Sequence, residues 1–144
     1  MISKAKWFTK LNVSAVFHKI HIAEDDKWLT VFRIWYGLYE WLVIFFGLAG
    51  ASSTFQKYIN NTLREYLNWF CSAYLDDVLI FIDDSKKEHT EHIRKILKAL
   101  KKAGLNLNIS KCEFSIRITK YLDFIIKVEK NIRINSEKIK VIQE

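Results

Sequence analysis

The sequence predicts an α+β fold in which an antiparallel sheet carries two helices on one face. The expected order is a split β-α-β-β-α-β (ferredoxin-like) plan with an added hairpin. Two stretches have apolar residues at helical spacing, and strand-like segments precede, separate and follow them. The 144 residues are 50% apolar and 15% aromatic, which is ample for one packed core.

The first third of the chain is expected to form one strand and then the added hairpin. The strand is predicted at residues 7–11, with an irregular segment after it that runs through Phe17. Residues 28–35 and 38–44 are rich in aromatic and β-branched residues and flank a short turn at 36–37. Two such runs around a turn are typical of a β-hairpin.

Two helices are predicted from apolar residues that recur every three or four positions. These positions are Phe55, Ile59, Leu63 and Leu67 in the first helix, and Ile93, Ile96, Leu97 and Leu100 in the second. Ser53 with Gln56, and Ser85 with Glu88, have the spacing of capping boxes, so each helix is expected to begin near its serine. Gly104 is placed to end the second helix.

Short apolar runs account for the remaining elements. The strands are expected at residues 71–75 and 78–82, between the helices, and at residues 112–118, 121–128 and 131–134, after the second helix. A last helix is expected to begin at Ser136, with Asn135 as its cap.

Two adjacent carboxylates, Asp76 and Asp77, lie between the strands expected at 71–75 and 78–82. An ionised carboxylate beside a core is costly unless it is paired, solvated or bound to a metal. The dipeptide alone leaves two interpretations open: a turn, in which Asp is common, or a metal site. In the split plan the first strand lies beside this pair of strands, so Asn12 is expected to come close to the two carboxylates.

The charge of the chain is uneven. Residues 1–85 carry 8 Lys and Arg against 9 Asp and Glu, whereas residues 86–144 carry 15 against 7. A basic half favours an anionic partner such as nucleic acid, or is simply the solvated face of helices. No apolar run approaches the roughly 20 residues of a membrane span, and the N-terminus lacks the apolar region of a signal peptide. We therefore expect an intracellular protein (cytoplasm or nucleus) with no membrane partner, and with Cys71 and Cys112 as buried thiols.

Five segments carry a resemblance to a known family. They are FTKLNVSAVFHKI (8–20), FFGLAGASSTFQ (45–56), YLDD (74–77), LNLNISKCEF (105–114) and YLDFI (121–125). In order and spacing they are similar to the palm motifs of the reverse transcriptases (RNA-directed DNA polymerases) of gypsy-type LTR retrotransposons, across essentially the whole chain. The resemblance implies a polymerase palm at residues 1–134 and the start of a truncated following (thumb) segment at residues 135–144.

The resemblance also implies a metal site. Asp76 and Asp77 match metal-binding, catalytic carboxylates of the family, and Asn12 stands where the family has a third, an aspartate. The family holds two Mg²⁺ ions here, which activate the primer 3′-hydroxyl and neutralise the charge of the transferring phosphate. Asn12 offers a carbonyl oxygen but no charge, so Mg²⁺ binding is expected to be weakened and activity lost or strongly impaired. The implied partners are an RNA or DNA template-primer, a dNTP and other segments of a polyprotein.

Five further positions match family residues near the substrates. Phe17 resembles the residue beneath the incoming sugar that excludes a ribose 2′-hydroxyl, and Gln56 resembles a glutamine that touches the incoming nucleotide and the template. Lys111 matches a lysine near the triphosphate, placed to protonate the leaving pyrophosphate. Tyr121 and Leu122 match the hairpin that grips the primer end. Simpler interpretations are that Phe17 is a core residue, Gln56 part of a helix cap and Lys111 a surface charge.

The chain departs from the family pattern at positions besides 12. The family usually has Ala or Gly at 16, Pro at 45 and 52, Gly at 123 and Asp-Pro at 135–136, where this chain has Val16, Phe45, Ser52, Asp123, Asn135 and Ser136. Each change follows from one or two C-to-T or G-to-A transitions, and the chain has no proline. Our hypothesis is that the chain is a degenerate fragment of a retrotransposon that has accumulated mutations of this one direction. We expect it to lack the fingers, thumb and RNase H segments.

Other functions remain open on the sequence alone. A non-catalytic RNA-binding module of RRM-like topology shares the β-α-β-β-α-β order, although no Arg/Lys-Gly-Phe pattern is present. An inert translated remnant that folds poorly is the other alternative. The spacings of His18 with His21 and of His89 with His92 suit zinc, but no Cys or acidic partner completes a site in sequence. These histidines are therefore expected to be solvated.

Overall fold

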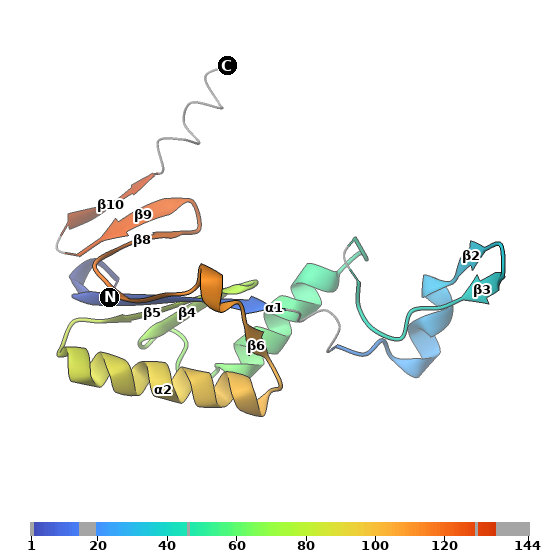
Figure 1. The fold of residues 1–144 in the computed structure, drawn as a ribbon, viewed down its shortest axis with the longest axis horizontal. Coiled ribbons are helices and arrows are strands. Elements are labelled where there is room, and N and C mark those ends of the chain that lie inside the picture. Colours follow the sequence, from blue (N-terminus) through green and yellow to red (C-terminus); the bar gives the residue numbers. More distant parts are fainter. Residues whose placement is uncertain (1, 15–19, 46, 129, 135–144) are drawn as a thin grey trace, which may run out of the picture.

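The protein forms an antiparallel central sheet with helices on one face and a small second sheet on the other (Figure 1). The computed structural model describes residues 2–14, 20–45, 47–128 and 130–134. The central sheet contains β1 (Trp7–Ser14), β4 (Cys71–Tyr74), β5 (Asp77–Ile82), β6 (Asn106–Leu107) and β7 (Glu113–Ile116). Its order is β4-β5-β1-β6, and β7 also pairs with β1. The expectation of an α+β fold with an antiparallel sheet is confirmed.

The other elements surround this sheet. They are α1 (Ala51–Thr62), α2 (Lys86–Lys102), the hairpin of β2 (Phe32–Ile34) and β3 (Gly37–Tyr39), the sheet of β8 (Ile118–Tyr121), β9 (Phe124–Lys127) and β10 (Lys130–Ile134), and the 3-10 helices η1 (Ile2–Lys4), η3 (Glu24–Thr30) and η4 (Ile109–Lys111). Neither α-helix of the described residues combines the length and apolar composition of a membrane span. The helix expected from Ser136 lies outside the described residues.

The alternation of β1 separates the two faces of the central sheet. Leu11 is fully buried in a core that contains residues of α1 and α2, whereas Phe8 is fully buried in a second core with Tyr121 of β8. Successive side chains of a strand point to opposite faces. Lys10 and Asn12 therefore share the face of Phe8, on which β8 and β9 lie, and the two helices lie behind the other face (Figure 1).

Both ends of α2 are capped as the sequence predicts. The Ser85 hydroxyl accepts a hydrogen bond from the Glu88 amide at 3.3 Å. At the other end Gly104 adopts φ +70°, and the Leu105 amide donates to the Leu100 carbonyl at 2.9 Å. Such a left-handed residue satisfies the last carbonyls of a helix, and glycine adopts it without strain.

The capping box predicted for the first helix is wrong. The helix begins at Ala51 with Gly50 as its N-cap, and the Ser53 hydroxyl donates to the Gly50 carbonyl at 2.8 Å. The side chain of Gln56 cannot complete a cap because its amide is bound to the β4–β5 turn. A tertiary contact thus takes the group that a local cap would have used.

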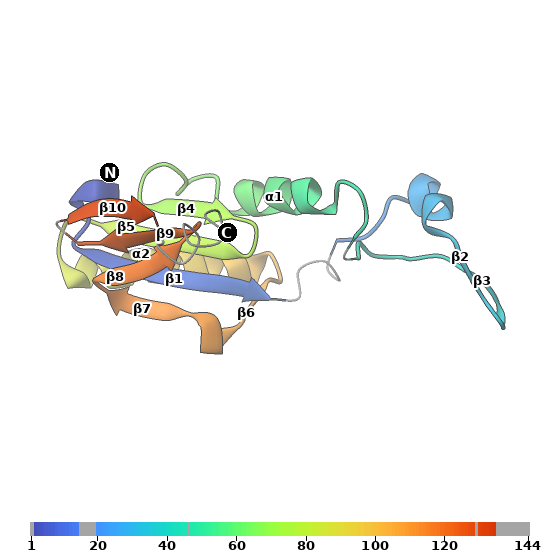
Figure 2. The ribbon, with the colours of Figure 1, turned by 90° about the horizontal axis from the view of Figure 1, so that it is seen from above.

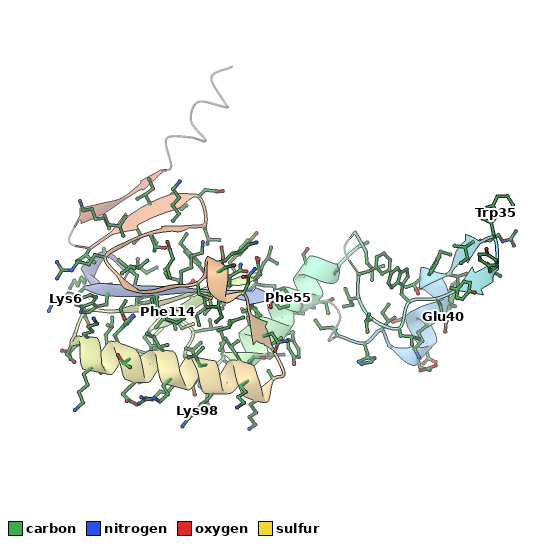
Figure 3. All side chains as sticks on the ribbon, viewed as in Figure 1. Lys6, Trp35, Glu40, Phe55, Lys98 and Phe114 are labelled. Carbon is green, nitrogen blue, oxygen red and sulfur yellow. The ribbon has the colours of Figure 1, made fainter. Side chains whose placement is uncertain are left out.

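The added hairpin is shorter than expected and projects away from the central sheet. Residues 28–30, predicted as strand, belong to η3, so β2 and β3 have three residues each. The Thr30 hydroxyl donates to the Lys27 carbonyl at 2.6 Å and accepts from the Trp41 amide at 2.9 Å. These bonds end η3 and tie it to the returning chain. Figure 2 shows the hairpin beyond the end of α1, and Figure 3 shows Trp35 at its tip.

The strands predicted at 112–118 and 121–128 are each divided. A bend at Arg117 separates β7 from β8, and a two-residue turn at Leu122 and Asp123 separates β8 from β9. Both turn residues have positive φ, +47° and +67°. Two left-handed residues form the turn whose twist matches a hairpin. The apolar residues around it conceal this turn, and Asp123, a residue type common in turns, is its only local signal.

Replacing Asp123 by Gly is expected to stabilise the protein. Glycine adopts positive φ without the Cβ clash that an L-residue meets, so Asp123→Gly should raise the free energy of unfolding by about 0.5–1 kcal/mol. Urea denaturation followed by circular dichroism measures the change. Asp123→Ala is the control, since it removes the carboxylate and retains the Cβ; an equal gain in both variants would contradict backbone strain as the cause.

Candidate active site

Asn12 meets both carboxylates of the acidic pair. Asp77 begins β5 directly opposite Asn12 on β1, and Asp76 lies in the turn before it. The Asn12 Nδ2 atom donates to Asp76 Oδ2 at 3.0 Å and to Asp77 Oδ1 at 3.2 Å. The Val13 amide also donates to the Asp76 carbonyl at 2.7 Å, which holds the turn against β1. The expected proximity of position 12 to the pair is confirmed.

Lys10 supplies the positive charge closest to the pair. Its Nζ atom lies 3.6 Å from Asp77 Oδ2 and donates to the Lys120 carbonyl of β8 at 3.2 Å. The Lys10 and Asp77 side chains are 21% and 27% exposed, so water screens this attraction only in part. Lys10 thus joins the acidic pair to the β8–β9 hairpin, a role that the sequence analysis missed. The two-residue spacing from Asn12 along one strand was its only signal.

An open cavity of about 680 Å³ extends from Asp77 to the β8–β9 hairpin. Its lining includes Lys10, Asn12, Asp77, Lys111 and Lys120. Lys111 is exposed at the end of η4. Glu113 also lines it, so the cavity combines two carboxylates with three ammonium groups, a charge pattern that suits a ligand carrying both a metal ion and phosphates.

Gln56 braces the turn that carries the acidic pair. Its Oε1 atom accepts from the Leu75 amide at 2.7 Å, and its Nε2 atom donates to the Ala73 carbonyl at 3.1 Å. Leu75 has φ +49°, a strained backbone for a residue with a bulky side chain. The glutamine amide thus fixes both sides of a strained turn from α1. Gln56 is half-buried behind the turn.

The other residues matched to substrate positions are placed differently from one another. Tyr121 is buried, and its hydroxyl lies 3.1 Å from the Ser72 hydroxyl on β4. Burial raises the pKa of Tyr121, so its phenol stays protonated. Leu122 is 39% exposed at the tip of the β8–β9 hairpin. Phe17 lies outside the described residues.

The two cysteines differ in burial. Cys71 is buried, and burial raises the pKa of its thiol to about 12, which leaves it protonated and unreactive. Cys112 is only half-buried, so the expectation of a second buried thiol is wrong. Its Sγ atom accepts from the Asn12 amide at 3.3 Å and donates to the Asn108 carbonyl at 3.2 Å. Cys112 therefore supports the backbone of Asn12.

The expectation that His89 and His92 are solvated is wrong. Both are buried on the inner face of α2. His89 Nε2 lies 2.8 Å from the Thr9 hydroxyl, and the His92 ring stacks on Phe70 at a centroid distance of 3.7 Å. Their place at the spacing of the apolar stripe was the signal. His21 is exposed, and His18 lies outside the described residues.

The two carboxylates of the acidic pair suit a divalent ion, but the Asn12 amide is not oriented to bind one. Two carboxylates and an amide converge, and oxygen ligands of this kind suit Mg²⁺. Among the described residues no cluster of three His, Cys, Asp or Glu side chains gathers to hold a metal. The amide faces the carboxylates with its NH₂ group, so its oxygen turns toward an ion only if the amide rotates.

The whole sequence matches the family described as reverse transcriptase (RNA-dependent DNA polymerase), over residues 1–144. The chain belongs to the reverse transcriptase family. The resemblance to gypsy-type elements is also confirmed by relatives. The chain is 37% identical over 143 residues to the retrovirus-related Pol polyprotein from transposon gypsy of Drosophila melanogaster, and 34% identical over 143 residues to that from transposon opus of the same species. Each alignment covers 99% of this chain and 14% of the polyprotein, so the chain spans about one seventh of these relatives.

Solved structures of reverse transcriptases share the fold. The foamy viral protease-reverse transcriptase in complex with RNA/DNA hybrid matches 99% of this chain and 20% of its own, with a TM-score of 0.80 and 22% identity. The native prototype foamy virus protease-reverse transcriptase matches 88% of this chain and 17% of its own, with a TM-score of 0.74 and 27% identity. The α+β fold of this reverse transcriptase chain is therefore that of solved family members.

Proposed function

We propose that this chain is the palm of a retrotransposon reverse transcriptase in which Asp76 and Asp77 bind divalent metal. The substrates would be a dNTP and an RNA or DNA template-primer, and the reaction would join the nucleotide to the primer 3′-hydroxyl. Mg²⁺ at this site would activate that hydroxyl and neutralise charge on the transferring phosphate. The observation that carries the proposal is the meeting of Asn12 with both carboxylates at 3.0 and 3.2 Å.

The same contact supports strongly impaired activity in this copy. An aspartate at position 12 would add a third negative charge, whereas the amide of Asn12 donates hydrogen bonds to the charges already present. Lys10 offsets a further part of the charge on Asp77. A site whose negative charge is already offset by neighbouring protein groups binds metal ions weakly. The proline-free composition is consistent with a degenerate copy, and we propose a split ferredoxin-like palm over 1–134 with a thumb segment beginning in 135–144.

The remaining roles follow the geometry less directly. Lys111 shares the cavity of Asp77, which supports a role at the triphosphate. Leu122 at the exposed hairpin tip suits a primer contact, while Tyr121 would act by anchoring that hairpin to β4. Gln56 would act by holding the turn of Asp76 from behind.

An RNA-binding module without chemistry is less well supported. Such modules stack bases on aromatic residues of the central strands. Tyr74 at the end of β4 is paired with Asp77 and is exposed on that face of the sheet, whereas Phe8 and Phe81 are buried beneath the β8–β9 hairpin. They are not accessible to a base unless the hairpin leaves.

Metal titration tests the proposal, with Mn²⁺ as the probe and its free concentration followed by electron paramagnetic resonance. Asp76→Asn and Asp77→Asn should each weaken Mn²⁺ binding by tenfold or more, because each removes a unit charge at the ion. A second adjacent pair, Asp83 and Asp84, is exposed at the other end of β5 and offers matched control variants. Equal losses in both pairs would rule out a specific site.

Primer extension tests the impairment separately. We expect no extension of a DNA primer on an RNA template by the unmodified chain with Mg²⁺ or Mn²⁺, because the electrostatic term on which phosphoryl transfer depends is weakened. Robust extension would refute impairment and leave the metal site standing.

A further inference from the structure

The helix layer carries a basic groove on the side of the central sheet away from the acidic pair. The groove has a volume of about 650 Å³ and runs between the segment after α1 and the C-terminal half of α2. The helices pack behind the sheet face of Leu11, whereas Asn12 and Asp77 belong to the cavity beside β8 and β9. The groove is therefore separate from the candidate active site.

Four cations line this groove. Lys95, Lys98 and Lys102 occupy positions i, i+3 and i+7 of α2 and so form one row, and Arg64 faces them from the segment after α1. The one carboxylate in the lining is Glu65. Within the part of the chain that the structure describes, the ion pairs involve other side chains. The groove thus carries a net positive charge.

The four cationic side chains are exposed, and the three lysines form a row along the groove. All four residues are exposed, and Figure 3 shows Lys98 on the outer side of α2, away from the sheet. At 1.5 Å per residue the row from Lys95 to Lys102 spans about 10 Å. A row of this length suits a ligand with repeated charges better than one compact anion.

An aromatic side chain lies beside the row of cations. Tyr66 lines the same groove and is half-buried, and its ring packs against Phe70 with centroids 5.4 Å apart. Phe70 is 2% exposed and belongs to the core. Tyr66 therefore offers part of a ring whose position is held from behind.

We propose that this groove binds single-stranded nucleic acid, with Arg64 and the three lysines on its phosphodiester backbone and Tyr66 stacking on a base. A cationic groove that follows the backbone, combined with aromatic stacking, is how sequence-independent single-strand binding is built. An acidic peptide matches the charges but brings no base for Tyr66. The inference does not depend on metal binding or catalysis at Asp76 and Asp77.

Binding of a labelled single-stranded oligonucleotide of about 16 nucleotides, followed by fluorescence anisotropy at several salt concentrations, tests the inference. The groove variant replaces Lys95, Lys98 and Lys102 by Gln. The control replaces Lys57, Lys87 and Lys101 by Gln, three exposed lysines outside the groove lining. Both variants lose the same charge, and glutamine retains helix propensity.

The groove variant should bind about tenfold more weakly and should lower the slope of log affinity against log salt by about 2, since each lost phosphate contact removes about 0.7 for a single strand. The control should lose less than about threefold. Equal losses in the two triple variants would overturn the inference. Should the triple variant melt early, Lys98→Gln alone should lower the slope by about 0.7, and an unchanged slope would overturn the inference equally.

Two further comparisons identify the ligand and the face. Tyr66→Leu should weaken binding about fivefold or more while Tyr66→Phe retains it, because stacking needs the ring; equal binding by the two variants would overturn the nucleic-acid assignment. Displacement of the oligonucleotide by polyglutamate at equal charge would overturn it as well. Lys127→Gln, at an exposed position of β9 on the other face of the central sheet, should leave the affinity unchanged, and a loss there would move the binding to that face.

Discussion

Asn12→Asp is expected to make the stability of the protein depend on divalent metal. Without metal the variant loses two hydrogen bonds from the Asn12 amide to Asp76 and Asp77 and places a third carboxylate beside them. Hydrogen bonds to charged groups contribute about 1.5–3 kcal/mol each. Because Asp76 is exposed, water replaces part of the bond to it, so the metal-free variant should be less stable by about 2–4 kcal/mol. Saturating Mg²⁺ or Mn²⁺ should restore that stability, because an ion that binds only the folded state stabilises it.

Mn²⁺ affinity should rise tenfold or more in Asn12→Asp, since a unit charge at about 4 Å from an ion is a large electrostatic term. Thermal melts in chelator and in Mn²⁺, with a direct Mn²⁺ titration, measure both effects. Asn12→Ala is the control: it loses the same two hydrogen bonds, adds no charge and should gain no affinity. If Asn12→Asp responds to metal just as the unmodified chain does, position 12 does not contribute to an ion site.

Acidification from pH 7 to pH 4.5 is expected to destabilise the protein through His89. Burial is the main cause that lowers the pKa of His89 to about 4, and the neighbouring His92 lowers it further. The unfolded chain takes up the proton near pH 6.5 while the folded chain does not, so the stability from this residue is complete above pH 6.5 and falls as pH decreases toward 4. The full loss is about 3 kcal/mol.

The environment of His89 explains why protonation is unfavourable. The Thr9 hydroxyl accepts from the Ser115 amide at 3.0 Å and is placed to donate to His89 Nε2 at 2.8 Å. In the described structure His89 Nδ1 is buried without a hydrogen-bond partner. A charged imidazolium would add a second buried donor in this place.

Urea denaturation at several pH values measures the effect. The slope of the free energy of unfolding against pH reports how many protons the unfolded chain binds in excess of the folded chain. His89→Gln should lower that number by up to one between pH 6.5 and 4. His21→Gln, at an exposed position of the projecting hairpin region, is the matched control and should leave the dependence unchanged. A profile for His89→Gln that parallels the unmodified chain would show that His89 does not titrate in this way.

Local pattern accounts for much of the fold. The apolar stripe of α2, its serine cap and Gly104 all follow from residues within one or two turns of each other, and the structure places them as expected. The β8–β9 hairpin could not be predicted from local pattern in the same way. Leu122 and Asp123 form a turn that is set by the pairing of β8 with β9, and a single Asp within an apolar run is too weak a signal to predict it.

The sequence by itself determined the family and the neighbourhood of the site. Ordered motifs along one chain indicate a common ancestor, and the strand order they imply brings position 12 to Asp76 and Asp77 without any knowledge of side-chain contacts. Tertiary structure alone decided how the amide is used, that Lys10 reaches Asp77 and Lys120, and that Gln56 braces the turn. The physical reason is that secondary structure depends on neighbours along the chain, whereas these hydrogen bonds join residues far apart in sequence and depend on register and packing.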